Sequence, residues 1–97
     1  MRRAAKVDRN HPEIVAALRT AGVQVLSLAA IGKGVPDLLL LHRGRLQLVE
    51  VKDGSQSPSR RRLTPLQEAF RAAWPVAVID SADDAIALFM GSSEPQP

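Results

Sequence analysis

The sequence predicts one α+β domain, in which a mixed four-stranded sheet is flanked by helices. The chain of 97 residues is long enough for a single hydrophobic core and too short for two. Its apolar residues alternate between helical spacing and short strand-like runs, in the order helix-strand-strand-strand-helix-strand-helix. We expect a core over about residues 9–91, a basic arm over 1–8 and a frayed tail over 92–97.

The first helix is expected over residues 11–21. Asn10-His11-Pro12-Glu13 is typical of a helix start, with the cap at one of its first two residues, because proline is tolerated in the first turn and a carboxylate favours the positive helix end. Gly22 can end the helix in a left-handed conformation. Residues 23–28 then form a predicted strand, and the glycines and proline of residues 29–36 indicate a loop.

Two strand-like runs, residues 37–42 and 45–52, flank Arg43-Gly44 and predict a β-hairpin. Arginine is not the preferred first turn residue, so a two-residue turn and a four-residue loop both remain open. Both give the same register, because a slip by one residue would place leucines opposite polar side chains. In that register Leu41 faces Leu46, Leu39 faces Leu48, and Asp37 faces Glu50.

The second half of the chain begins with a polar, basic loop over residues 53–63. Thr64-Pro65-Leu66-Gln67 matches a capping box and predicts a helix from residue 65 to 73, which Pro75 ends. The apolar residues 76–79 fit a strand buried on both faces and parallel to the third strand. A last short helix is expected from Ser81-Ala82-Asp83-Asp84 to about Met90.

The composition favours a polyanionic partner. Thirteen Lys and Arg against ten Asp and Glu give a net charge of +3 and a pI near 10.2. The three aromatic residues, Phe70, Trp74 and Phe89, all lie in apolar segments, so a base-stacking platform is not expected. Contacts to nucleic acid would therefore be made mainly to phosphates.

The absence of cysteine excludes disulfides, thiolate zinc sites and cysteine nucleophiles, and it is compatible with a reducing compartment. Asp8, Arg9 and Asn10 occupy the place where a signal peptide would need apolar residues, so export is not expected. No apolar run approaches the ~20 residues of a membrane span. We therefore expect a cytoplasmic protein.

Asp37 and Glu50 are the strongest candidates for chemistry, because like charges facing each other across two strands need a nearby cation. Lys52 lies on the same strand face as Glu50 by the alternation of side chains. In one interpretation Asp37 caps a turn, and Glu50 and Lys52 form a surface ion pair. In the other, both carboxylates and the Val51 carbonyl bind Mg²⁺ or Mn²⁺, while Lys52 orients or deprotonates water or stabilises charge on phosphate.

Gly34-Val35-Pro36-Asp37, with Asp37 thirteen residues before the first residue of Glu50-Val51-Lys52, resembles the PD-(D/E)xK nuclease superfamily, whose core order is αβββαβ. The chain is most similar to its VRR-NUC branch, which includes stand-alone phage-type nucleases. In that branch a helix-one Glu precedes the motif and a Gln-bearing helix follows it, here at Glu13 and Gln67. The likeness spans roughly residues 9–80 and implies a restriction-endonuclease-like core with a short C-terminal helix, a single nuclease domain over residues 1–97.

The resemblance implies that Asp37, Glu50 and the Val51 carbonyl bind the metal, that Lys52 serves the attacking water and that Gln67 is also catalytic. Glu13 would add a carboxylate through water or a second ion. For Glu13 the alternative is a charge that only favours the helix dipole. For Gln67 the alternative is the capping box alone.

The function implied by the resemblance is a Mg²⁺- or Mn²⁺-dependent DNA endonuclease that hydrolyses phosphodiesters, acts on structured or branched DNA, and works as a homodimer. Its setting would be the cytoplasm of a bacterial or phage-infected cell, without a membrane or an organic cofactor. A catalytically inactive nucleic-acid-binding module on the same scaffold is the alternative, and a structural or protein-interaction subunit is a third hypothesis.

Several basic residues are candidates for phosphate contacts, although a solvated charge run is the commoner explanation of such residues, because loops are usually polar. Neither histidine has a partner arrangement for zinc or for a Ser/His/Asp triad, so neither is given a role. The candidates for nucleic-acid binding are Arg9, Lys33, Arg60, Arg61 and Arg62.

Overall fold

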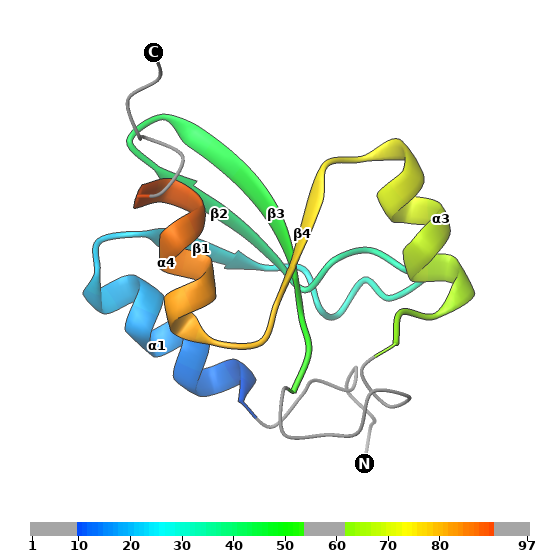
Figure 1. Cartoon of the computed structure of the whole chain (residues 1–97), viewed down its shortest axis with the longest axis horizontal. Helices are drawn as coiled ribbons and strands as arrows, with labels where there is room; N and C mark the ends of the chain where they lie inside the picture. The colour runs from blue at the N-terminus through cyan, green and yellow to red at the C-terminus, as the bar shows by residue number, and fades with distance from the viewer. Residues whose placement is uncertain (1–9, 54–61, 91–97) are drawn as a thin grey trace.

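The computed structural model describes residues 10–53 and 62–90 (Figure 1). The basic arm, the tail, and Arg9, Arg60 and Arg61 lie outside the described residues. The observed helices and strands follow the predicted order. They are α1 (His11–Thr20), β1 (Gln24–Ser27), β2 (Leu38–His42), β3 (Arg45–Val51), α3 (Pro65–Ala73), β4 (Val76–Ile79) and the short C-terminal helix α4 (Ala82–Met90).

The four strands form one mixed sheet in the order β1-β2-β3-β4. β1, β2 and β3 are successively antiparallel, and β4 runs parallel to β3, as the helical crossover between them predicts. An α+β fold with a mixed sheet is therefore confirmed. Of the helices among residues 10–53 and 62–90, none is long and apolar enough to cross a membrane.

The hairpin register is the predicted one, with Leu39 paired to Leu48 and Leu41 to Leu46. Arg43 and Gly44 form a two-residue turn with φ values of 52° and 80°, so the two-residue alternative is correct. Positive φ at both turn positions is the geometry that matches the twist of the flanking strands. The two-residue turn and the leucine pairs agree on this register, in which Leu40 faces Gln47, even though arginine is an uncommon residue at the first turn position.

The core lies between the sheet and the helix pair α1 and α4, which sit side by side on one face (Figure 1). α3 lies apart from them, on the other side of the sheet. Full burial of an aliphatic side chain contributes about 1.5–3 kcal/mol, so this layer supplies most of the hydrophobic stabilisation. Its fully buried aliphatic side chains are Ile14, Leu18, Leu38, Leu40, Val49 and Val51.

The prediction that residues 76–79 are buried on both faces is wrong. β4 is an edge strand, and within it only Ile79 is buried, while Val78 is 38% exposed. The physical reason is that α4 covers one face of β4 whereas α3 covers the other incompletely. A short apolar run does not reveal how many faces of its strand are covered.

Candidate functional site

Asp37 is fixed at the start of β2 by two hydrogen bonds. Its backbone carbonyl accepts from Leu28 N at 2.7 Å, and its side-chain Oδ2 accepts from Val51 N at 2.8 Å. The β2–β3 pairing ends at Val49, two residues before Val51. The Asp37 carboxylate therefore accepts the Val51 N–H bond that a backbone carbonyl of a longer β2 would otherwise accept. Continuing the register by one residue places Asp37 opposite Glu50, in agreement with the sequence prediction.

Glu50 is a buried carboxylate, only 5% exposed, and it is the second-last residue of β3. Its Oε2 accepts from Gln67 Nε2 at 2.8 Å and lies 3.8 Å from Lys52 Nζ. A buried charge is costly unless it is paired and hydrogen-bonded, and here both conditions are met. Glu50 and Lys52 therefore form the ion pair that one interpretation predicted. That interpretation is wrong in placing the pair at the surface, because the Glu50 carboxylate is buried.

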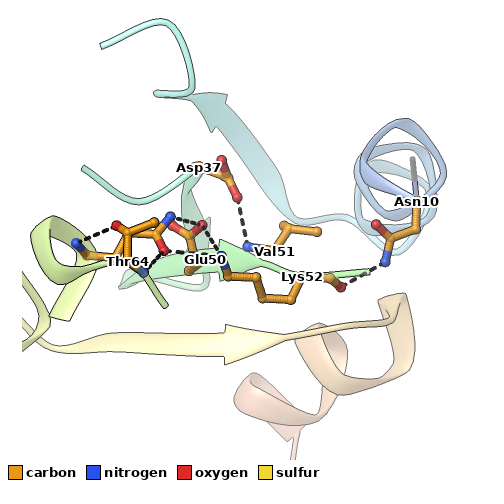
Figure 2. Close-up of polar contacts among 7 residues, drawn as sticks. Asn10, Asp37, Glu50, Val51, Lys52 and Thr64 are labelled. Atoms are coloured by element: carbon orange, nitrogen blue, oxygen red, sulfur yellow. Dashed lines mark hydrogen bonds and ion pairs between the residues drawn. The ribbon is translucent and has the colours of Figure 1, made fainter. Parts of the chain in front are cut away.

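Gln67 connects Glu50 and Lys52 to the start of α3. Its Oε1 accepts from Lys52 Nζ at 3.1 Å and from Thr64 N at 2.9 Å, while its backbone N–H donates to Thr64 Oγ1 at 3.2 Å. The amide must point its oxygen at these two donors and its nitrogen at the carboxylate, because the reverse orientation would oppose like groups. The capping box predicted for Gln67 is thus present, and the same side chain also contacts the Glu50 and Lys52 side chains. Figure 2 shows Thr64, Glu50 and Lys52 in this region.

Gly34 allows α3 to reach this position. It has a φ of 84°, and a Cβ added to it would lie 2.5 Å from the carbonyl oxygen of Leu66. The loop before Asp37 therefore touches the first turn of α3 backbone to backbone. Only glycine permits both this conformation and this approach without a shift of the helix. Gly34 and Gln67 line a small hollow between α3 and the sheet, together with Pro36 and Glu50.

Asn10 precedes α1, as predicted, but its side chain makes no helix-capping hydrogen bond. Its Nδ2 donates instead to the Lys52 carbonyl at 3.1 Å and to the Asp80 carbonyl at 3.0 Å, the first of which is drawn in Figure 2. Asn10 therefore ties the start of α1 to the ends of β3 and β4. Sequence reasoning missed this role, because an asparagine before a proline-containing helix start looks the same whether it caps or bridges.

The remaining predicted residues lie outside this network. Glu13 is exposed in the first turn of α1. Within the part of the chain that is described, no group of three or more His, Asp or Glu side chains could hold a metal ion, so Glu13 forms no such group with Asp37 and Glu50. Lys33, with a φ of 57°, and Arg62 are both exposed. Their contacts to phosphate stay predictions.

The residues near the end of β3 offer oxygen atoms of the kind that a hard divalent cation takes as ligands. Asp37 and Glu50 supply carboxylates from neighbouring strands, and carboxylate oxygens are what Mg²⁺ and Mn²⁺ prefer. In the described residues Asp37 Oδ1 has no hydrogen-bond partner, since only Oδ2 is used by Val51. The Val51 carbonyl leaves the strand on the same edge as its amide, which points at Asp37.

Comparison of the chain with protein-family models, with curated proteins and with solved structures gives no match. The resemblance described above therefore depends on motif residues. The structure places four of these residues in one region: Asp37 before β2, Glu50 in β3 and Lys52 directly after β3, all labelled in Figure 2, together with Gln67 in α3. They come from segments up to thirty residues apart in the sequence.

Proposed function

We propose that this protein is a Mg²⁺- or Mn²⁺-dependent DNA endonuclease that hydrolyses phosphodiester bonds, with structured or branched DNA as its substrate and the cytoplasm as its setting. The observation that carries the proposal is the hydrogen-bonded group formed by Glu50, Lys52 and Gln67 beside the Asp37 carboxylate. A lysine held beside a carboxylate, with a second carboxylate on the neighbouring strand segment, is an arrangement that water-mediated cleavage of phosphate esters uses.

Asp37, Glu50 and the Val51 carbonyl would hold the metal. When bound, the ion would polarise a phosphate oxygen and lower the pKa of its bound water. Asp37 is well prepared for this role, because the Val51 amide fixes one carboxylate oxygen and thereby the direction of the other. Glu50 is held from the opposite side by Gln67.

Lys52 would orient the attacking water or stabilise negative charge on the reacting phosphate. Its ammonium group has three N–H donors, of which one is bound to Gln67 Oε1 and another faces Glu50 Oε2. Among the described residues Gln67 is the one hydrogen-bond acceptor of this amine, so an N–H that remains would face water or phosphate. Because the first two contacts fix the side chain, the amine is held in position before substrate binds, which is the condition for electrostatic catalysis.

The proposal is tested with duplex, flap, single-stranded and four-way-junction DNA, each incubated with Mg²⁺ or Mn²⁺ and analysed on denaturing gels. We expect the protein to cleave at least one of these substrates. Lys52→Ala and Asp37→Asn should lower the rate at least ~100-fold, the loss typical of removing one preorganised stabilising group. The asparagine oxygen of Asp37→Asn can still accept from Val51 N, so this variant keeps the fold.

Asp83→Asn is the matched control, because Asp83 is an exposed carboxylate in the first turn of α4 and lies outside the site. It should cleave at the wild-type rate. Cleavage that survives in both Lys52→Ala and Asp37→Asn would remove the proposed site. Salt-dependent DNA binding without cleavage on any substrate would refute the endonuclease and support the inactive binding module.

A further inference from the structure

Trp74 is an exposed aromatic residue outside the candidate site. It directly follows α3, its backbone N–H donates to the Phe70 carbonyl at 2.9 Å, and its side chain is 54% exposed. The Phe70 ring stacks on it, with a centroid distance of 5.3 Å and an interplanar angle of 14°. Its apolar segment gives no reason to expect a stacking platform, yet the structure exposes the ring. An aromatic face that a neighbour fixes and solvent reaches is able to stack on a flat ligand.

Trp74 forms one wall of a groove on the sheet face that lies opposite α1 and α4. Leu39 and Leu48, which pair across β2 and β3, give the groove an apolar floor. Its lining carries no charged side chain, so a groove of this kind fits a flat, uncharged and largely apolar ligand. We call it the Trp74 groove. It has a volume of about 400 Å³ and is lined by Leu39, Leu46, Gln47, Leu48, Trp74 and Pro75.

The Trp74 groove is next to the candidate site, on the same face of the sheet. Leu48 lies two residues before Glu50 on β3, and Leu39 lies two residues after Asp37 on the neighbouring segment. Alternation places residues that are two apart on one face of a strand, and two residues span about 7 Å. A nucleic acid strand with a phosphate at the two carboxylates would therefore bring a neighbouring base to the groove.

The polar groups beside the groove match a nucleotide. Gln47 donates through Nε2 to the Leu48 carbonyl at 2.9 Å, and among the described residues its Oε1 accepts no hydrogen bond, so this oxygen is available to a base amino group. Arg71, three residues before Trp74, donates through Nε to the Val76 carbonyl at 3.3 Å. Because Val76 pairs with Leu48, the guanidinium lies near the groove and supplies the cation that a phosphate needs. A purely apolar partner would use neither group.

We propose that the Trp74 groove binds one unpaired nucleobase of the substrate, stacked on the indole of Trp74, while Arg71 contacts an adjoining phosphate. The inference rests on the proposed function and makes it more specific: cleavage occurs beside an unpaired nucleotide, and Trp74 is the residue that selects this nucleotide. A base within a duplex would first have to leave its stack, which costs free energy.

Trp74 is the only tryptophan of the chain, so tryptophan fluorescence reports on the groove alone. The full chain is titrated, without metal, with a short single-stranded oligothymidine and with an abasic oligomer of the same length and charge. We expect the oligothymidine to quench the fluorescence saturably and to bind about tenfold more tightly than the abasic oligomer, as the stacking of one base predicts. The abasic oligomer should leave the fluorescence unchanged.

Trp74→Ala should lose this preference and bind the two oligomers equally, measured by the anisotropy of a label on the oligomer. Trp74→Phe keeps an aromatic ring and should retain part of the preference. Leu26→Ala is the matched control, because Leu26 is 57% exposed on the edge strand β1 and does not line the groove. It should bind both oligomers as wild type does. Circular dichroism verifies that each variant is folded.

The proposal is overturned if wild type binds the two oligomers equally, if it binds neither, or if Trp74→Ala keeps the preference. A fluorescence change that follows protein concentration without any oligomer would show that a second copy of the chain covers Trp74, and it would overturn the proposal as well. Because the titrations contain no metal, they are independent of cleavage. Loss of the base preference would leave the endonuclease assignment standing, and absence of cleavage would leave the base preference measurable.

Discussion

At the scale of single residues, Gln67 makes the contacts that hold the candidate site together. One amide side chain accepts from the backbone of Thr64 and from Lys52, and it donates to the buried Glu50 carboxylate. The start of α3 and the geometry of the candidate site therefore depend on the same atoms. A change at Gln67 should be seen both in the stability of the fold and in the position of Lys52.

Gln67→Ala should lower the free energy of unfolding by about 2–3 kcal/mol, because it removes a hydrogen bond to a charged group together with part of a capping box. Urea denaturation followed by circular dichroism measures this change. Glu68→Ala, at the next position and exposed, is the control and should change stability by less than about 0.5 kcal/mol. Equal stabilities of the two variants would show that the amide is not essential to the site.

Gly34→Ala should be more destabilising than Gly44→Ala, although both residues have nearly the same φ, 84° and 80°. A left-handed conformation alone costs an alanine about 1–2 kcal/mol. At Gly44 nothing lies within 4 Å of the new Cβ, whereas at Gly34 the Leu66 carbonyl is in the way. Overpacking adds about 1–3 kcal/mol, so thermal unfolding should separate the two variants by that amount. Matching melting temperatures would contradict the close contact.

At the scale of elements, Asn10 joins α1 to the ends of two strands. The sequence predicts where α1 begins and places its cap at Asn10 or His11, but the Asn10 side chain makes no capping hydrogen bond. The two roles respond differently to one substitution. Aspartate is as good a cap as asparagine and suits the positive helix end, but it cannot donate hydrogen bonds to carbonyl groups.

Asn10→Asp should therefore destabilise the protein by about 1–3 kcal/mol, since the Lys52 and Asp80 carbonyls lose a shared donor and face a carboxylate instead. Chemical denaturation of the purified variant measures this effect. Pro12, in the same helix turn, provides a control as Pro12→Ala, because it is exposed and its substitution leaves the bridge intact. Unchanged or increased stability of Asn10→Asp would restore the capping interpretation.

The elements that were predicted correctly share a physical cause. The hairpin register follows from the pairing of Leu39 with Leu48 and of Leu41 with Leu46 across a two-residue turn, and the start of α3 follows from a capping box whose four residues are contiguous. The partly exposed face of β4 and the contact between Gly34 and Leu66 depend on where α3 sits in space. No local pattern encodes that position, so these features became visible only in the structure.

The same distinction holds within the candidate site. That Asp37 faces Glu50 and that Lys52 shares a face with Glu50 could be inferred from strand alternation. The hydrogen bond from Val51 N to Asp37 could not, because it forms beyond the end of the β2–β3 ladder, where pairing rules no longer apply. The sequence offered two alternatives for Gln67, a capping box or contacts to the candidate site. It could not show that one side chain makes both the capping hydrogen bond to Thr64 and the hydrogen bonds to Lys52 and Glu50.

At the scale of the whole molecule, the two faces of the sheet differ in what covers them. α1 and α4 close one face over the core, while the other face exposes apolar side chains such as Leu26 and Leu46 at the hairpin end and carries Glu50 with Lys52 at the opposite end. This division keeps the proposed metal site apart from the packed core, so substitutions at the site can be made without opening the core.

The most direct test of the central claim is a calorimetric titration of Mn²⁺ into the wild-type protein and into Asp37→Asn. If Asp37 and Glu50 together hold a divalent ion, wild type gives a saturable binding heat and the variant binds at least tenfold more weakly, a difference of about 1.4 kcal/mol. Identical titrations of the two proteins, or no saturable heat from wild type, would contradict the assignment of this carboxylate pair as a metal site.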